Sequence, residues 1–150
     1  MIVALDFDGT LLTHVWPEVG KDIGAFEWVV PLQVKYTELK YILWTVRGGK
    51  PLDDAVEYCN DRGLFFWGIN RNPDQSTWSF SNKVYANCYV DDAAIGAPII
   101  HGDEGTRPYI NWNEMGPLLT CKVDEHFSGD GDYLDLAQMQ AAILEAESGE

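Results

Sequence analysis

The chain has 150 residues, 46% of them hydrophobic and 13% aromatic, and its 24 acidic against 10 basic residues give a formal charge of −14. This length is that of one domain, and the apolar content is enough for a core, which excludes intrinsic disorder. The negative charge disfavours nucleic acid and anionic lipid as partners. No apolar run approaches the roughly 18 residues of a membrane span, so no membrane association is expected.

The first ten residues, MIVALDFDGT, contain a short apolar run that ends in charge. A secretory signal would need a basic start and a longer apolar run, so we expect the protein in the cytoplasm. The run itself is typical of a buried strand at residues 2–5. Hydrophobic patterns and breakers predict further strands at 41–44, 64–67 and 88–90, and helices at about 23–36 and 53–59. Pro31 falls inside the first of these helices and is expected to kink or shorten it.

Strands that alternate with helices predict an α/β fold, with a parallel sheet and right-handed crossovers. Three of the four predicted strands end in a polar turn, and these turns should meet because parallel strands have their carboxyl ends at one edge. Beyond residue 96 the pattern is less clear: 109–119 is expected to be a short helix or mostly loop. An amphipathic helix is predicted at about 132–147, with Asp132 as its N-cap.

Two carboxylates follow the first strand directly, in the segment Asp6-Phe7-Asp8-Gly9-Thr10. Acids spaced two residues apart at the edge of a sheet can share a cation, and one can attack a substrate while the other handles the proton. Gly9 allows a sharp turn between them and the following loop. An ordinary Asp-Gly turn, which is common in α/β proteins, would have the same residues, so the segment alone leaves both interpretations open.

This DFDGT segment after a hydrophobic strand resembles motif I of the haloacid dehalogenase (HAD) superfamily of phosphohydrolases. The resemblance implies a three-layer, Rossmann-like domain. It also implies that Asp6 is a nucleophile that forms an aspartyl-phosphate, and that Asp8 is the general acid/base. In that pattern Asp8 protonates the leaving oxygen, then activates water, and also lends its backbone carbonyl to the metal.

Other segments resemble the later motifs of the superfamily, in the order that the family has. Thr45, which ends the YILWT segment, resembles the motif II hydroxyl that bonds the transferred phosphoryl group. Lys83 resembles the motif III lysine, which offsets charge on the nucleophile and phosphate. Asp91 and Asp92, after the CYV strand, resemble the acidic motif IV that completes the metal site. By the same resemblance we expect Asp92 to be a metal ligand and Asp91 to be the partner of Lys83.

The expected cofactor is Mg²⁺, because a phosphoryl group is repelled by carboxylates unless a cation lies between them, and Mg²⁺ prefers oxygen ligands. The metal ligands are then expected from Asp6, Asp8, Asp91 and Asp92. Arg47 follows Thr45 closely, and some small members of the superfamily have a similar LWTxR segment. Arg47 is therefore either a residue that contacts the phosphate or substrate, or one partner of a surface ion pair.

The gaps after Asp8 and between Thr45 and Lys83 are too short for an inserted cap domain, so the chain resembles the capless members over about residues 1–120. We expect a single domain over 1–150 that hydrolyses a small phosphorylated metabolite or nucleotide. Open alternatives are a phosphatase for a macromolecular phosphate, a phosphotransferase or mutase, and a non-catalytic phosphate-binding module. An open site also suits a second subunit that serves as a lid, so a homo-oligomer is possible.

Overall fold

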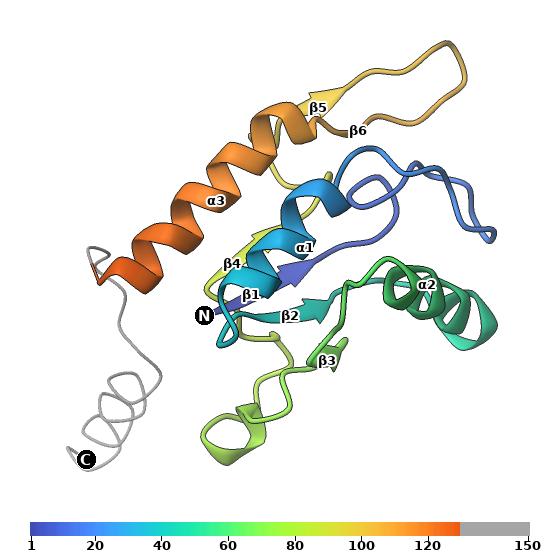
Figure 1. Cartoon of the computed structure of the whole chain (residues 1–150). Coiled ribbons are helices and arrows are strands. Elements are labelled where there is room, and N and C mark those ends of the chain that lie inside the picture. Colours follow the sequence, from blue (N-terminus) through green and yellow to red (C-terminus); the bar gives the residue numbers. More distant parts are fainter. Residues whose placement is uncertain (130–150) are drawn as a thin grey trace.

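The computed structural model describes residues 1–129, so the helix predicted at about 132–147 lies outside the described part of the chain. A parallel four-stranded sheet forms its centre, with strand order β3-β2-β1-β4 (Figure 1). The strands are β1 (Ile2–Leu5), β2 (Lys40–Leu43), β3 (Gly68–Ile69) and β4 (Cys88–Val90). The helices are α1 (Phe26–Lys35), α2 (Gly49–Asp61) and α3 (Trp112–Ser128), with a short 3-10 helix, η1 (Gln75–Thr77). A small antiparallel pair, β5 (Ile99–Ile100) and β6 (Tyr109–Ile110), precedes α3.

This architecture confirms the predicted α/β class, with a parallel sheet flanked by helices in a Rossmann-like arrangement. The strand at 2–5 and the strand at 88–90 lie where the sequence predicts them. Pro31 lies inside α1 and does not end it. Within residues 1–129 the connections between elements contain no inserted domain.

The core is built on the alternation of side chains along the strands. Val3 and Leu5 of β1 and Tyr41 and Leu43 of β2 point to one face, where they join apolar side chains from all three helices in one buried cluster. The Tyr41 hydroxyl donates to the carbonyl of Val29, which ties α1 to this face of the sheet. The strands that carry the site residues are therefore stabilised by packing against α1, α2 and α3.

The third strand does not lie at residues 64–67, where the sequence predicts it. The ladder with β2 is formed by the two residues that follow, Gly68–Ile69. The backbone of Phe65 is bonded instead by a side chain: its N–H donates to Gln33 Oε1 at 3.1 Å, and its carbonyl accepts from Gln33 Nε2 at 2.8 Å. Leu64 is buried in the core while the Phe65 side chain is largely exposed. The apolar residues at 64–67 therefore connect α2 to the sheet, and the prediction of a strand there is wrong.

The segment expected to be a short helix or mostly loop at 109–119 is β6 followed by the first turns of α3, a helix of 17 residues. Asn111 caps this helix, since its side chain accepts the N–H of Asn113. α3 lies beside α1 (Figure 1), and Gly116 allows the close approach: a Cβ there would meet the Trp28 ring at 2.1 Å. The helix runs on through Pro117.

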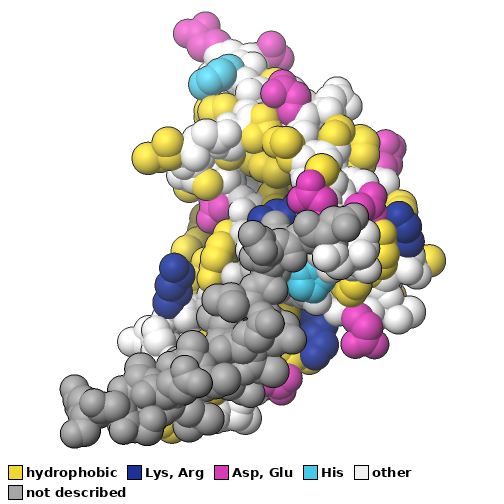
Figure 2. Space-filling model, turned by 90° about the vertical axis from the view of Figure 1, so that its left-hand side faces the viewer, with side chains coloured by type: hydrophobic (Ala, Val, Ile, Leu, Met, Phe, Trp, Pro, Cys, Tyr) yellow, Lys and Arg dark blue, Asp and Glu magenta, His cyan; other side chains and the backbone are white. Residues whose placement is uncertain are grey.

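The described helices include none with the length and apolar character that crossing a bilayer requires. Figure 2 views the molecule from the side of the amino ends of the strands. On this face the described basic side chains form separate spots among acidic and apolar ones, with no continuous basic patch.

Candidate active site

The carboxyl ends of the strands meet at one edge of the sheet because the strands are parallel, and the hydrogen-bond ladder continues one residue past β1, β2 and β3. The N–H of Asp6 donates to Val90 O at 2.9 Å, that of Trp44 to Leu5 O at 2.8 Å, and that of Asn70 to Leu43 O at 2.8 Å. These bonds fix the first residue after β1, β2 and β3 in neighbouring positions. A cavity of about 400 Å³ lies there, lined by Asp6, Trp44, Thr45, Val46, Asn70 and Asp91.

Three carboxylates gather at this edge. Asp6, Asp91 and Asp92 each place one oxygen within 4.8 Å of the others. Burial raises the pKa of Asp6 to about 7, and the nearby charges of Asp91 and Asp92 act in the same direction, against hydrogen bonds from the Phe7 N–H and the Thr10 hydroxyl. Crowded carboxylates of this kind are stabilised by a cation, and an all-oxygen donor set is the kind that Mg²⁺ prefers. The three residues thus fit Mg²⁺, whereas the carboxylate of Asp8, the fourth residue expected from the sequence to supply a ligand, does not belong to this cluster and is bonded by Arg47.

Asp91 and Asp92 both reach the cluster, although adjacent residues of an extended strand would point to opposite faces. The alternation ends because β4 stops at Val90 and the chain turns, with Ala94 N–H donating to Asp91 O at 3.1 Å. The Ala93 N–H also donates to Oδ1 of Asp91 at 2.8 Å. Asp91 and Asp92 are therefore both placed as possible ligands.

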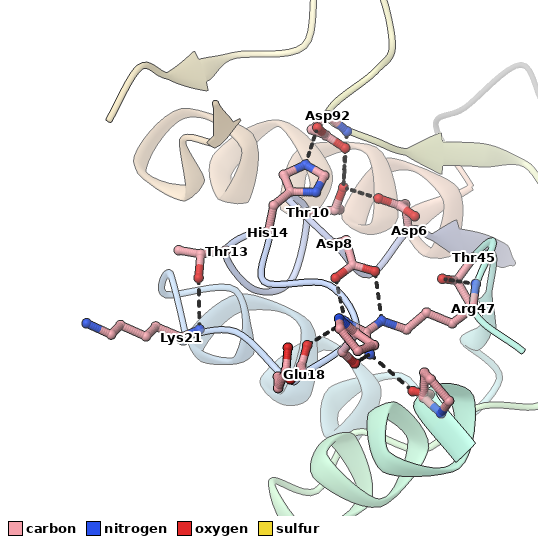
Figure 3. Close-up of polar contacts among 12 residues, drawn as sticks. Asp6, Asp8, Thr10, Thr13, His14, Glu18, Lys21, Thr45, Arg47 and Asp92 are labelled. Atoms are coloured by element: carbon pink, nitrogen blue, oxygen red, sulfur yellow. Dashed lines mark hydrogen bonds and ion pairs between the residues drawn. The ribbon is translucent and has the colours of Figure 1, made fainter. Parts of the chain in front are cut away.

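Thr10 links the first motif to the last. Its buried hydroxyl donates to Oδ2 of Asp6 at 2.9 Å and accepts the N–H of Asp92 at 3.0 Å (Figure 3). Its carbonyl accepts from Nε1 of Trp112 at 2.7 Å, which anchors the motif to α3. Nothing in our sequence reasoning assigned Thr10 this role, although it belongs to the DFDGT segment itself.

His14 also contacts the cluster, with Nε2 at 3.0 Å from Oδ2 of Asp92. Gly9 makes room for it. The glycine has a φ of 81°, and a Cβ there would lie 2.2 Å from His14 Nε2 and 2.7 Å from Asp92 Oδ2. The requirement for glycine in this motif is therefore steric as well as conformational. His14 thus adds a hydrogen-bonding group beside Asp92.

Arg47 forms a two-pronged ion pair with Asp8, in which Nε donates to Oδ2 and a terminal nitrogen to Oδ1, both at 2.7 Å. The other N–H groups donate to the carbonyls of Pro17 at 2.9 Å, Glu18 at 2.8 Å and Pro51 at 3.2 Å. These contacts use all five N–H groups of a guanidinium. Arg47 is only 2% exposed. The ion pair is thus buried and not at the surface, and Arg47 does not line the cavity beside Asp6, where contact with a phosphate or substrate was expected.

Aromatic rings close around the same guanidinium. Its central carbon lies 4.8 Å from the ring centroid of Phe7 and 5.2 Å from that of Trp16. The loop after β1 thus wraps over Arg47, which joins that loop to the start of α2 through the Pro51 carbonyl (Figure 3). A residue that contacts three segments in this way fixes the position of Asp8 relative to Asp6.

Thr45 lies in the cavity, as the sequence predicts. Its hydroxyl accepts the N–H of Arg47 at 3.1 Å, and its own N–H donates to Oδ1 of Asn70 at 2.8 Å. Asn70 has a positive φ of 52°, which is uncommon outside glycine and is tolerated best by Asn and Asp. We did not identify Asn70 from the sequence; an asparagine at the end of a strand that faces a polar turn is the signal that points to it.

Lys83 is not brought to the carboxylates. It is exposed, and its Nζ lies 6.0 Å from the Tyr89 ring centroid. Within residues 1–129 its side chain forms no hydrogen bond or ion pair, so the expected pairing with Asp91 is absent. The prediction relied on the order of the motifs, and order alone does not fix which way a lysine on a long loop points.

The fold and the strand-end cluster define an α/β domain with a carboxylate site at the carboxyl edge of a parallel sheet. No protein-family model and no curated protein matches the chain. A solved structure, that of a conserved protein from Bacteroides thetaiotaomicron, matches with a TM-score of 0.63 and 34% sequence identity, over 81% of this chain and 91% of that chain. The chain therefore belongs to the same family as this conserved Bacteroides protein.

Proposed function

We propose that the protein is a Mg²⁺-dependent phosphomonoester hydrolase of the HAD superfamily that acts through an aspartyl-phosphate on Asp6. The observation that carries the proposal is the cluster of Asp6, Asp91 and Asp92 beside a cavity at the carboxyl edge of the sheet. The order of the motif residues along the chain supports assignment to this superfamily: Asp6, Asp8, Thr45, then Asp91 and Asp92. The substrate class we propose is a small phosphorylated metabolite or nucleotide of the cytoplasm.

In the first step an Asp6 oxygen attacks phosphorus while the bond to the leaving oxygen breaks. The Thr10 hydroxyl fixes Oδ2 of Asp6, so the carboxylate is already oriented when substrate arrives. The Thr45 hydroxyl accepts from the Arg47 N–H and keeps its own proton to donate to a phosphoryl oxygen. A bound Mg²⁺ would offset the charge of the carboxylates and polarise the phosphoryl group.

Asp8 supplies a proton to the leaving oxygen, and then takes one from the water that attacks phosphorus and releases Asp6. Both Asp8 oxygens accept hydrogen bonds from Arg47. Each oxygen has a second lone pair, so Asp8 can carry the proton while still accepting the hydrogen bonds from Arg47, and the charge attraction between them returns when the proton is given up. Arg47 is thus a positioning residue in this proposal, in place of the substrate-binding role expected from the sequence.

The test is phosphate release from a panel of phosphomonoesters with Mg²⁺, with EDTA, and with the Asp6→Asn variant. The matched control is Asp53→Asn, an exposed acid on α2. We expect release that needs metal, that survives in the control, and that is lost in Asp6→Asn. A phosphorylated protein trapped by acid quench in the wild type and absent in Asp6→Asn would identify the intermediate. Full activity in Asp6→Asn refutes the nucleophile, and no release across the panel favours a macromolecular substrate or a binding module.

A further inference from the structure

The loop between β3 and β4 contains a second cavity, of about 280 Å³, which we call the loop pocket. Most of the residues that line it are polar, and those that matter here are Asn70, Arg71, Gln75, Ser79 and Asn82. Serine hydroxyls and side-chain amides can both donate and accept hydrogen bonds. This composition suits a polar ligand better than an apolar one.

The loop pocket has a preformed wall because buried amides hold its loop. Gln75 is 7% exposed, and its Nε2 donates to the carbonyls of Ser81 at 3.1 Å and Lys83 at 2.8 Å, while its Oε1 accepts the N–H of Tyr85 at 2.8 Å. Asn72, also 7% exposed, donates to the Tyr85 carbonyl at 3.1 Å. Buried amides that are fully bonded rigidify the backbone they hold. Little ordering is then left for a ligand to impose.

Asn70 connects the loop pocket to the cavity beside Asp6, because it lines both. Its Oδ1 is held by the Thr45 N–H, and within residues 1–129 its Nδ2 donates to no partner. If a phosphoryl group binds beside Asp6, the loop pocket lies next to it, on the other side of Asn70. The rest of a substrate could extend into the loop pocket.

Arg71 is the basic residue of this wall. It is exposed, and it forms no hydrogen bond, ion pair or ring contact within residues 1–129. Arg47, by contrast, has every N–H group occupied. In a chain with a formal charge of −14, a free guanidinium at the edge of a polar pocket favours an anionic group there.

We propose that the loop pocket binds the leaving part of the substrate and that Arg71 selects substrates in which this part carries a second anionic group, a carboxylate or another phosphate. The inference rests on the proposed phosphohydrolase function, since it assigns the substrate class of that site. Arg71 acts here on binding, so its loss should raise KM for a doubly anionic substrate and leave kcat nearly unchanged.

The test compares glycerol 3-phosphate with 3-phosphoglycerate, two phosphomonoesters that differ chiefly in a carboxylate. We expect the wild type to have a KM about tenfold lower for 3-phosphoglycerate, and Arg71→Ala to remove that preference by raising this KM about tenfold, as the loss of one charged contact does. The control is Lys35→Ala, which makes the same change in net charge. Lys35 pairs with Asp124 on α3, near the amino edge of the sheet.

Equal KM changes for both esters in Arg71→Ala, or equal changes in both variants, would overturn the inference and leave the phosphohydrolase activity standing. If the wild type turns over neither ester, the same pair is titrated against it by calorimetry in the presence of Mg²⁺. Tighter binding of 3-phosphoglycerate that Arg71→Ala removes would support the loop pocket although the hydrolase proposal fails. Equal or absent binding of both esters would overturn the inference as well.

Discussion

The ion pair between Arg47 and Asp8 gives a quantitative prediction that does not depend on the proposed reaction. In Arg47→Met the apolar stem is kept and the guanidinium is lost, so the Asp8 carboxylate is left with its side chain only 13% exposed and without its partner. Breaking one side of a buried pair costs about 3–5 kcal/mol. With a urea slope of about 2 kcal/mol/M for a small domain, the unfolding midpoint should fall by about 2 M.

A double-mutant cycle separates the pair from the rest of the arginine's contacts. Asp8→Asn alone leaves the guanidinium without a charged partner, and Arg47→Met alone leaves the carboxylate without one. The double variant leaves neither charge unpaired. The sum of the losses in unfolding free energy of the two single variants should therefore exceed the loss in the double variant by about 1.5–3 kcal/mol. The matched control is the cycle of Lys50→Met and Asp54→Asn.

The control pair is a surface contact on α2 at 2.6 Å, with side chains 82% and 39% exposed. Exposed pairs of this kind contribute little to stability, because solvent screens them. Both cycles are measured by urea unfolding at one pH and one salt concentration. A coupling between Arg47 and Asp8 no larger than that of the control pair would refute the claim that Arg47 fixes Asp8.

Three further predictions concern the carboxylate cluster and its surroundings. Mg²⁺ at 100 times its dissociation constant should stabilise the folded state by about 2.7 kcal/mol, and Asp91→Asn should reduce this gain, as thermal melts with and without EDTA will measure. In EDTA, the stability that protonated Asp6 provides should be complete below about pH 4 and be lost as the pH rises towards 7, because folding raises its pKa from the ordinary 3.8 to about 7. The rise corresponds to about 4 kcal/mol, and the difference in unfolding free energy between wild type and Asp6→Asn should change with pH by an amount of that order; a flat difference would contradict it. Gln75→Ala should cost about 1–3 kcal/mol, since it leaves two carbonyls and an N–H without partners, and should speed hydrogen exchange in the loop before β4, whereas Gln33→Ala should leave exchange in that loop unchanged.

The parts of the fold that the sequence predicts well are those decided locally. The run Ile2–Leu5 and the run Cys88–Val90 are apolar, short and followed at once by aspartate, so strand, strand end and site residue are read from the same few positions. The third strand could not be placed in this way. The backbone of Phe65, inside the predicted strand, is bonded by the side chain of Gln33 on α1, a contact between residues 32 positions apart that local pattern does not reveal.

The site shows the same division between local and distant information. Asp6 and Asp8 lie two residues apart in a recognisable segment, but the partner of Asp8 lies 39 residues away, and only the folded chain shows that it is Arg47. The motif order pointed to Lys83, but order along the chain says nothing of the direction of its side chain, which lies over Tyr89. Asn70 has no motif at all, and its importance comes from a positive φ and from the two cavities that it borders.

The positions of Lys83 and Arg47 change what the proposed chemistry requires of the metal. A lysine at the carboxylates would offset part of their charge and leave some affinity for phosphate without a cation. Here Lys83 is exposed elsewhere, Arg47 is spent on Asp8, and the cavity at Asp6 is lined by no basic side chain of the described residues. Charge compensation for an arriving phosphoryl group then falls to the cation alone. The metal should therefore govern the binding of the phosphoryl group as well as its transfer, and removing Mg²⁺ should raise KM along with lowering kcat.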